Sequence, residues 1–279
     1  MIGVFDSGVG GLSVWNEIVK ILPDEEIIYF GDSAYCPYGR KTREEIISRV
    51  TKIVDFLIDK GCELIVVACN TVTAAAIDYL RNSYSIPFVG MEPALKPAVL
   101  NSKTGVVGVL ATHGTLKGEL YHRTLHKYAA ETKVLEQAGD GLVELVESGE
   151  IDSDRGETLL RRYIIPMIEQ KADHIVLGCT HYPFLIDQIK HIAGDSVTIV
   201  NPAPAVAKHT AEILEHKRIC EQKQSTSVVN SVQDAYAEYV KRKPDTIKYQ
   251  FYTTGETGNV IKELACCNIM SESIHKIDL

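Results

Sequence analysis

The sequence of 279 residues lacks the long apolar runs that mark membrane spans, because no window approaches the ~18–20 consecutive apolar residues of a spanning helix. It also lacks an excess of basic residues. The net charge is −8, which argues against the basic surface that nucleic-acid binding requires. The segment from Met1 to Asp6 has neither the charged nor the apolar region of a secretory signal. We therefore expect a cytoplasmic protein that binds neither membranes nor nucleic acid.

Several motifs that would indicate a nucleotide, a structural metal or a redox site are also missing. No Cys-x-x-Cys occurs, so a zinc ribbon or a thioredoxin-type site has no support. The glycine-rich segment 6–11 lacks the spacing of a dinucleotide-binding G-x-G-x-x-G, and no G-x-x-x-x-G-K-[ST] appears. The seven cysteines, in a reducing compartment, are expected to be buried thiols or catalytic groups rather than disulfides.

What the chain does contain is a regular alternation of short apolar runs and amphipathic helical patterns. From the first apolar run, 2–5, to about residue 90, the pattern reads β-α-β-α-β-α-β. This order predicts a parallel sheet with right-handed crossovers. Thr42 and Glu45 form a capping-box signature at the start of one helix, and Gly61 ends that helix.

Near residue 92 the pattern restarts, and one stretch recurs in both halves of the chain. The segment 65–71 is an apolar run that ends in Ala-Cys-Asn-Thr, and 175–181 ends in Gly-Cys-Thr-His. The first cysteine follows Asp6 by 63 residues, and the second follows Ala111 by 68 residues. These similar spacings indicate an internal pseudo-repeat.

The repeat predicts an α/β fold of two similar domains. We expect mainly parallel sheets flanked by helices, a pseudo-two-fold relation between the domains, and the active site in the cleft between them. The β-prone segment 249–253 is followed by Thr254-Gly255, and polar residues also follow the other strands that lead to the predicted site. This similarity suggests that the chain returns to the first domain. We therefore expect residues 1–97 plus 208–279 to form the first domain and 98–207 the second.

Cys69 and Cys179 are the strongest candidates for chemistry, because each follows a predicted strand at the end where parallel sheets place their sites. A single cysteine is more often a small buried apolar group, but these two share matching polar surroundings. Cys36, in a loop that borders the predicted site, is a third candidate. Two thiols can carry a proton across a carbon, since a thiolate takes it from one face and a thiol returns one to the other. A free cysteine has a pKa of ~8.5, within tuning range for a general base.

Asp6 and His181 are the groups that we expect to tune these thiols. A carboxylate at Asp6 would favour the neutral thiol of Cys69 or accept a hydrogen bond from a substrate ammonium; the alternative is a cap of the following helix. His181 lies two residues beyond Cys179, on the same face of an extended segment. Its imidazolium would lower the thiol pKa, and its neutral form could take the proton; the alternative is a structural histidine. Cys69, Cys179 and His181 could instead bind zinc.

Hydroxyl and amide side chains follow the predicted strands, where helix N-termini also bind anions without arginine. This combination suits a small dicarboxylate, although any one hydroxyl could be a helix cap. The groups are Ser7, Asn70, Thr71, Thr112, Thr115 and Thr180, with backbone amides at Tyr38-Gly39.

Together these motifs resemble those of bacterial glutamate racemases. The matching segments are Gly3 to Val14, Gly31-Asp32, Pro37-Tyr38-Gly39, Ala68 to Thr71, Gly178 to Pro183 and Phe251 to Gly255. The resemblance implies an isomerase that interconverts L- and D-glutamate without pyridoxal phosphate, metal or other cofactor. It further implies a homodimer that supplies D-glutamate for peptidoglycan synthesis, and so for cell-wall biogenesis and cell shape.

The resemblance also assigns roles to residues. It implies that Cys69 deprotonates D-glutamate with help from Asp6, and that Cys179 deprotonates L-glutamate with help from His181. Its substrate-binding positions correspond to Asp6, Ser7, Pro37, Tyr38, Gly39, Asn70, Thr71, Thr112, Thr115, Glu147, Thr180 and His181. Competing functions are a racemase for aspartate or a hydantoin, a one-cysteine decarboxylase of the same superfamily, a zinc hydrolase, and a two-lobed protein that binds a dicarboxylate without chemistry.

Overall fold

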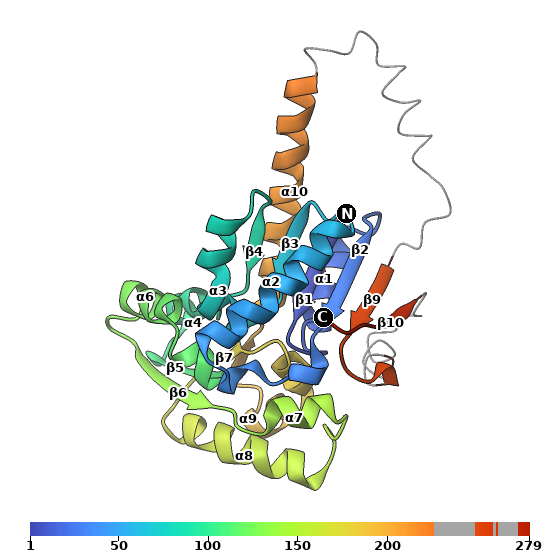
Figure 1. Ribbon diagram of the computed structural model, residues 1–279. Helices are drawn as coiled ribbons and strands as arrows, with labels where there is room; N and C mark the ends of the chain where they lie inside the picture. The colour runs from blue at the N-terminus through green and yellow to red at the C-terminus, as the bar shows by residue number, and fades with distance from the viewer. Residues whose placement is uncertain (226–248, 259–260, 262–272) are drawn as a thin grey trace.

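The computed structural model describes residues 1–225, 249–258, 261 and 273–279, and its strands form two sheets (Figure 1). The first sheet has the order β10-β9-β2-β1-β3-β4, and the second has the order β6-β5-β7-β8. Every pairing between the described strands is parallel. The strands are β1 (Ile2–Asp6), β2 (Ile27–Gly31), β3 (Leu64–Val67), β4 (Phe88–Gly90), β5 (Val106–Ala111), β6 (Lys133–Ala138), β7 (His174–Gly178), β8 (Thr198–Val200), β9 (Tyr249–Thr253) and β10 (Ile274–Lys276).

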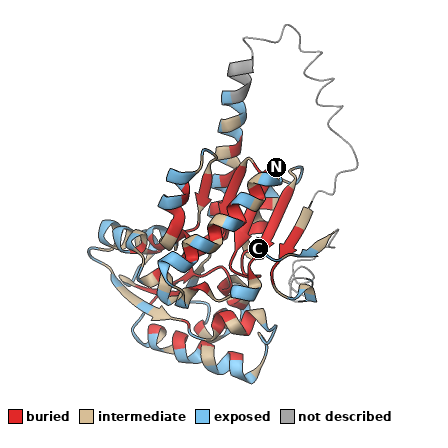
Figure 2. Ribbon diagram, viewed as in Figure 1, coloured by how far each residue is buried: buried red, intermediate tan, exposed pale blue. Residues whose placement is uncertain are grey.

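Helices flank both sheets, and they carry most of the exposed surface while the strands are mainly buried (Figure 2). This arrangement confirms the predicted α/β fold class. The helices are α1 (Leu12–Ile21), α2 (Arg43–Asp59), α3 (Asn70–Ser83), α4 (Leu95–Asn101), α5 (His113–Leu116), α6 (Glu119–Tyr128), α7 (Leu142–Glu147), α8 (Asp154–Glu169), α9 (Ile186–Ala193) and α10 (Ala203–Ser225), with short 3₁₀ turns η1 (Ser33–Tyr35), η2 (Tyr38–Arg40) and η3 (Tyr182–Leu185).

The order of the strands supports the internal repeat. Within the first sheet the run β2-β1-β3-β4 has the same connectivity as the whole second sheet, β6-β5-β7-β8. Strand β1 therefore corresponds to β5, and β3, which leads to Cys69, corresponds to β7, which leads to Cys179. The first sheet differs by two added strands, β9 and β10, from the C-terminal part of the chain. The chain thus returns to its first sheet, as the segment 249–253 predicted.

The largest cluster of buried apolar side chains runs through both halves of the molecule. It includes Trp15 and Tyr29 beside the first sheet and Leu160 and Ile175 beside the second. Trp15 also packs edge-on against Phe251 of β9, with ring centroids 5.1 Å apart. Because apolar burial is the main driving force of folding, this shared cluster couples the two sheets.

Local signals behave largely as the sequence predicts. Thr42 and Glu45 form a capping box at the start of α2. Gly61, with φ of +90°, ends that helix in the left-handed conformation that glycine tolerates best. The apolar pair 134–135 predicts only a short strand from the sequence, whereas β6 spans Lys133–Ala138. The sequence also predicts a helix near 232–241, which lies outside the described residues.

The predicted domain boundaries stay a prediction, and both fall inside helices, 97/98 within α4 and 207/208 within α10. Helix α10 continues across 207/208 and packs against α1 (Figure 1). Among the described residues, none of the helices combines the length and the apolar character that crossing a membrane requires.

Asp173 stabilises the start of β7. Its carboxylate accepts hydrogen bonds from the Ser102 hydroxyl at 2.7 Å and from the backbone amides of Lys103 and Thr104 at 2.6 and 3.0 Å. His174 Nδ1 lies 2.9 Å from the same carboxylate. Burial alone raises the pKa of Asp173, but these hydrogen bonds hold it well below its usual range.

We expect Asp173→Asn to lower the free energy of unfolding at neutral pH by about 1–3 kcal/mol, because the amides lose a charged acceptor. A depressed pKa stabilises the fold above the unfolded value of about 3.9 and stops doing so as pH falls toward the folded value. The difference in the free energy of unfolding between wild type and variant, measured by urea denaturation, should therefore narrow below that pH. The control is Asp78→Asn, whose side chain is 72% exposed and 4.0 Å from Arg123. An equal loss at all pH values would contradict the prediction.

Candidate active site

The candidate site lies where the carboxyl ends of both sheets meet. In each sheet the strand order reverses direction between two central strands, β1 and β3 in the first and β5 and β7 in the second. Open parallel sheets bind ligands at such switch points. Asp6 and Cys69 flank the first switch point, and Thr112 and Cys179 flank the second.

A small pocket opens between these strand ends. Cys69 and Cys179 are 4% and 5% exposed, so the pocket is nearly closed to solvent. Apart from Val143, every lining residue is a position predicted from the sequence. The lining residues are Ser7, Pro37, Tyr38, Gly39, Cys69, Asn70, Thr71, Thr112, Val143, Cys179, Thr180 and His181.

Cys69 occupies the position just before α3, at the N-terminal end of that helix. Its Sγ lies 3.8 Å from Ser7 Oγ. Burial and then the negative charge of Asp6 raise the pKa of the Cys69 thiol well above its usual range, although the backbone amide of Val72 opposes this. Cys69 is thus held as a neutral thiol, which suits a proton donor.

Asp6 is fully buried, and its carboxyl group holds the turn that leads into α1. Its Oδ2 accepts hydrogen bonds from the amides of Gly11 at 2.9 Å and Gly8 at 3.3 Å, at the turn into α1. Its Oδ1 accepts a hydrogen bond from Thr180 Oγ1 at 3.3 Å. Burial raises the pKa of Asp6, although the positive charge of His181 opposes the shift. Asp6 therefore connects the first strand to the loop that carries the second cysteine.

His181 lies between the second cysteine and a carboxylate. Its Nδ1 is 3.8 Å from Cys179 Sγ, and its Nε2 is 2.7 Å from Glu147 Oε1. Burial alone lowers the pKa of His181, but hydrogen bonds with Cys179, Cys36 and Glu147 raise it well above its usual range. A protonated imidazole stabilises a thiolate beside it. The two cysteines therefore have different partners: Cys69 lies near the carboxyl group of Asp6, and Cys179 lies near the imidazole of His181.

The glycine run after β1 explains how the second sheet comes this close to the first. A Cβ at Gly10 would clash with the His181 ring, and a Cβ at Gly8 would clash with the Glu147 carboxylate. These glycines therefore leave space for side chains of the second sheet. The sequence showed that the run does not fit a nucleotide motif, but it gave no sign of this steric role.

Some predicted substrate contacts lie next to the pocket rather than on its wall. Thr115 is 1% exposed and donates its amide to Thr112 Oγ1 at 3.2 Å. Glu147 contacts His181 on the side away from Cys179 and accepts the amide of Val9 at 2.7 Å. The structure thus places Glu147 as a partner of His181.

Two polar groups on the pocket wall are available to a ligand. The buried amide oxygen Oδ1 of Asn70 has no hydrogen-bond partner, although its Nδ2 donates to the carbonyl of Met91 at 3.4 Å. Thr71 and Thr112 approach from opposite sheets, with their Oγ1 atoms 2.9 Å apart. An unpaired buried acceptor costs free energy, so a donor such as an ammonium group is favoured beside Asn70.

The zinc alternative based on Cys69, Cys179 and His181 has no support in the geometry. Over the described part of the chain, the group of possible ligand atoms that lie within 4.8 Å of one another belongs to Cys36, Glu147 and His181.

The loop that carries Pro37, Tyr38 and Gly39 is held by a buried ion pair that the sequence did not reveal. Arg49 of α2 contacts both carboxylate oxygens of Asp32, at 2.7 and 3.0 Å. The Tyr38 hydroxyl donates to the same carboxylate, and Thr254 Oγ1 donates to it at 2.9 Å. Asp32 is fully buried and the Arg49 side chain is 11% exposed, so this pair is shielded from water.

We expect Arg49→Met to lower the free energy of unfolding by about 3–5 kcal/mol, because it leaves the Asp32 carboxylate buried without its cation. The double variant Asp32→Asn/Arg49→Met should recover much of this loss, since no charge stays unpaired. Urea denaturation measures both, and Arg43→Met is the control because Arg43 donates only to an exposed backbone carbonyl, that of Ala75. A double variant whose loss equals the sum of the two single losses would contradict the prediction.

Comparison with known proteins agrees with this geometry. Residues 2–210 match the family model described as Asp/Glu/Hydantoin racemase. The chain belongs to the Asp/Glu/Hydantoin racemase family. In this racemase fold both cysteines, and all residues that line the pocket, lie within the matched segment.

Several relatives of this chain are glutamate racemases. The glutamate racemase of Herpetosiphon aurantiacus is 49% identical over 213 residues, which cover 76% of this chain and 84% of that protein. The crystal structure of the glutamate racemase isoform RacE1 from Bacillus anthracis has a TM-score of 0.81 and 33% identity, and covers 100% of this chain and 97% of that one. The Escherichia coli glutamate racemase, solved with L-glutamate and the activator UDP-MurNAc-ala, has a TM-score of 0.81 and 31% identity over 99% of this chain and 97% of that one.

Proposed function

We propose that this protein is a glutamate racemase that interconverts L- and D-glutamate by proton transfer between two cysteines. The observation that carries the proposal is that Cys69 and Cys179 line one small pocket from equivalent strand ends of two repeated sheets. The relatives named above, which are glutamate racemases, support glutamate as the substrate.

From L-glutamate, the Cys179 thiolate takes the α-proton, and the Cys69 thiol donates its proton to the opposite face of the carbanion. The product is D-glutamate, with Cys179 now a thiol and Cys69 a thiolate. His181 Nδ1 lies 3.8 Å from Cys179 Sγ and is placed to assist proton transfer there, and the negative charge of Asp6 favours the neutral thiol of Cys69. In the reverse direction Cys69 is the base and Cys179 the acid.

The carbanion must be stabilised by fixed polar groups, because an amino-acid α-proton is far less acidic than a thiol. The N-terminus of α3 lies at the pocket, and hydrogen-bond donors in a closed, dry site are most effective on developing charge. Asn70 Oδ1 is the acceptor that we assign to the substrate ammonium, because it is buried and has no partner of its own. The hydroxyls of Ser7, Thr71 and Thr180 are assigned to the carboxylates.

The decisive experiment incubates L-glutamate in heavy water with purified protein free of pyridoxal phosphate. We expect D-glutamate to form and deuterium to enter at Cα. Parallel reactions with L-aspartate and a hydantoin test the other substrates named by the family description. Turnover of either of these without turnover of glutamate would reassign the substrate, and binding of glutamate without exchange would leave only a binding protein.

We further propose that the protein acts in the cytoplasm as a homodimer of two-domain subunits and supplies D-glutamate for peptidoglycan. The domains would be 1–97 with 208–279, and 98–207. The relatives support this biological role, and the shared strand order of the two sheets supports the division. Light scattering after size exclusion measures the oligomeric state, and a monomeric mass would contradict the dimer.

A further inference from the structure

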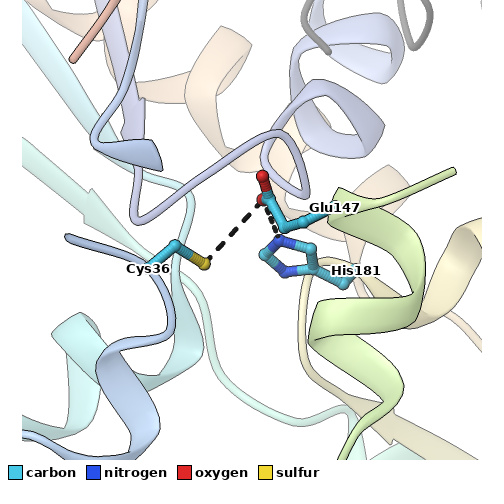
Figure 3. Close-up of side chains that lie close together, drawn as sticks. All are labelled: Cys36, Glu147 and His181. Atoms are coloured by element: carbon cyan, nitrogen blue, oxygen red, sulfur yellow. Dashed lines mark hydrogen bonds and ion pairs between the residues drawn. The ribbon is translucent and has the colours of Figure 1, made fainter. Parts of the chain in front are cut away.

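A third cysteine, which the proposed reaction does not use, lies beside the catalytic histidine. Cys36 Sγ is 3.8 Å from Glu147 Oε1, and Glu147 Oε1 is 2.7 Å from His181 Nε2 (Figure 3). The three side chains come from separate parts of the chain. Cys36 belongs to the loop between η1 and η2 beside the first sheet, Glu147 ends α7, and His181 follows β7. Their ligand atoms all lie within 4.8 Å of one another.

The chemistry of these donors fits one class of ion. A thiolate, an imidazole nitrogen and a carboxylate oxygen are the ligands that zinc prefers, and three protein ligands leave a fourth position for water. Zinc bonds of about 2.0–2.3 Å in tetrahedral geometry separate the ligand atoms by about 3.3–3.6 Å. The present separations of 2.7 and 3.8 Å bracket this range. Glu147 Oε1 would have to move away from His181 Nε2 by roughly half an ångström to reach that ideal spacing.

We propose that Cys36, Glu147 and His181 form a binding site for Zn²⁺ and that zinc bound there inhibits the enzyme. On binding, the thiol proton of Cys36 and the proton on His181 Nε2 are released to solvent, and the sulfur and that nitrogen bond to the metal. The inhibition rests on the proposed racemase function, whereas the metal site does not.

The surroundings hold these ligands in place. The Val9 amide donates to Glu147 Oε1 at 2.7 Å, and Gly8 leaves the space that the carboxylate occupies. The other ring nitrogen of His181, Nδ1, faces Cys179 at 3.8 Å, so the ring already presents Nε2 to the cluster. Partners of this kind orient metal ligands and add to affinity.

Inhibition follows from where the ligands are attached. The pocket is nearly closed, so glutamate can enter only when the loops of the two sheets separate. Zinc would join Cys36 beside the first sheet to Glu147 and His181 beside the second, and would oppose this separation. It would also occupy His181 Nε2, so the imidazole could no longer gain a proton there.

Cobalt(II) alone is the probe for the metal site, because it replaces zinc and gives an absorption spectrum. Thiolate ligation adds a charge-transfer band in the near ultraviolet, and tetrahedral geometry gives intense visible bands. All proteins carry Cys220→Ser, since the exposed Cys220 thiol lies 3.7 Å from His216 Nδ1 and could bind the metal itself. The compared variants add Cys36→Ser, Glu147→Gln or, as the matched control thiol in the same region, Cys69→Ser.

We expect Cys36→Ser to remove the thiolate band. It should also lower the affinity for zinc, measured by competition with cobalt, by at least about tenfold. Glu147→Gln should lower the affinity for zinc as well, and Cys69→Ser should leave both the thiolate band and the zinc affinity unchanged. In the racemase assay, with each variant compared with its own metal-free rate, Cys36→Ser should require at least about tenfold more zinc for half inhibition. Retained turnover would also show that this variant folds.

A thiolate band that survives Cys36→Ser but is lost in Cys69→Ser would overturn the proposal, since the metal would then lie between the catalytic thiols. Unchanged zinc affinity in both Cys36→Ser and Glu147→Gln would overturn it too. If the protein binds cobalt through Cys36 but does not turn over glutamate, the proposed function fails and the metal site stands. If it racemises glutamate with no Cys36-dependent cobalt spectrum, the metal site fails and the function stands.

Discussion

Replacing either Cys69 or Cys179 with serine is expected to slow racemisation in both directions by roughly 10²–10⁴-fold. Each conversion needs one thiolate and one thiol, and a serine hydroxyl is far too weak an acid to replace either. Because enantiomers have equal free energy in water, kcat/KM for L- and D-glutamate must stay equal to one another in every variant. Polarimetric initial rates from both enantiomers measure the loss and check this equality.

The control for these variants is Cys220→Ser, because Cys220 is exposed on α10 and we expect no change in rate. Isotope exchange tests which face of the substrate α-carbon each cysteine serves. Cys69→Ser keeps the base for L-glutamate, so deuterium should enter L-glutamate from heavy water faster than it enters D-glutamate. Cys179→Ser should show the opposite preference. Wild-type racemisation in either variant would contradict the two-base scheme, and equal exchange of both enantiomers would contradict the assignment of faces.

The second large effect concerns the two assisting groups. Asp6→Asn and His181→Asn should each slow racemisation by roughly 10²-fold or more, because each removes a charge placed beside one thiol. The affected step differs between them. His181→Asn should slow proton transfer at Cys179, and Asp6→Asn should slow proton transfer at Cys69.

Kinetic isotope effects distinguish these steps. With His181→Asn, the effect of α-deuteration should grow for L-glutamate, whereas for D-glutamate the solvent isotope effect should grow. Asp6→Asn should give the reverse pattern. Thr180→Val is a suitable comparison, because it removes the hydroxyl that donates to Asp6 without removing a charge. If both charge variants change the same isotope effect, the separate roles of the two groups are wrong.

The pH dependence of exchange tests the direction in which Asp6 shifts the pKa of Cys69. The negative charge of Asp6, after burial, raises the pKa of Cys69. Asp6→Asn removes that charge, so the pKa of Cys69 should fall. Deuterium exchange into D-glutamate, which needs the Cys69 thiolate, should therefore begin at lower pH in the variant than in wild type. A shift toward higher pH would show that Asp6 acts on Cys69 mainly through something other than its charge.

The sequence by itself determined the framework of the site. Short apolar runs alternating with amphipathic helices defined the parallel α/β fold, because side-chain periodicity reports local structure directly. The ends of these runs marked Asp6, Cys69 and Cys179, since parallel strands place their carboxyl ends at one edge. The sequence also placed His181 near the Cys179 thiol, but the extended segment assumed for 179–181 is wrong, because these residues form a turn with His181 in the helical region. Each of these inferences depends on neighbours within one strand or one turn.

Only the tertiary structure decided which distant groups meet these residues. Glu147 is 34 positions from His181 and 111 from Cys36, and no local pattern states that the end of α7 packs against both. The same holds for Arg49, whose partner Asp32 lies on a different element. Such contacts depend on how the two sheets pack, which the summed burial of many apolar side chains determines. The cysteines and their first partners could therefore be read from the sequence, whereas the carboxylate and third thiol around His181 required the fold.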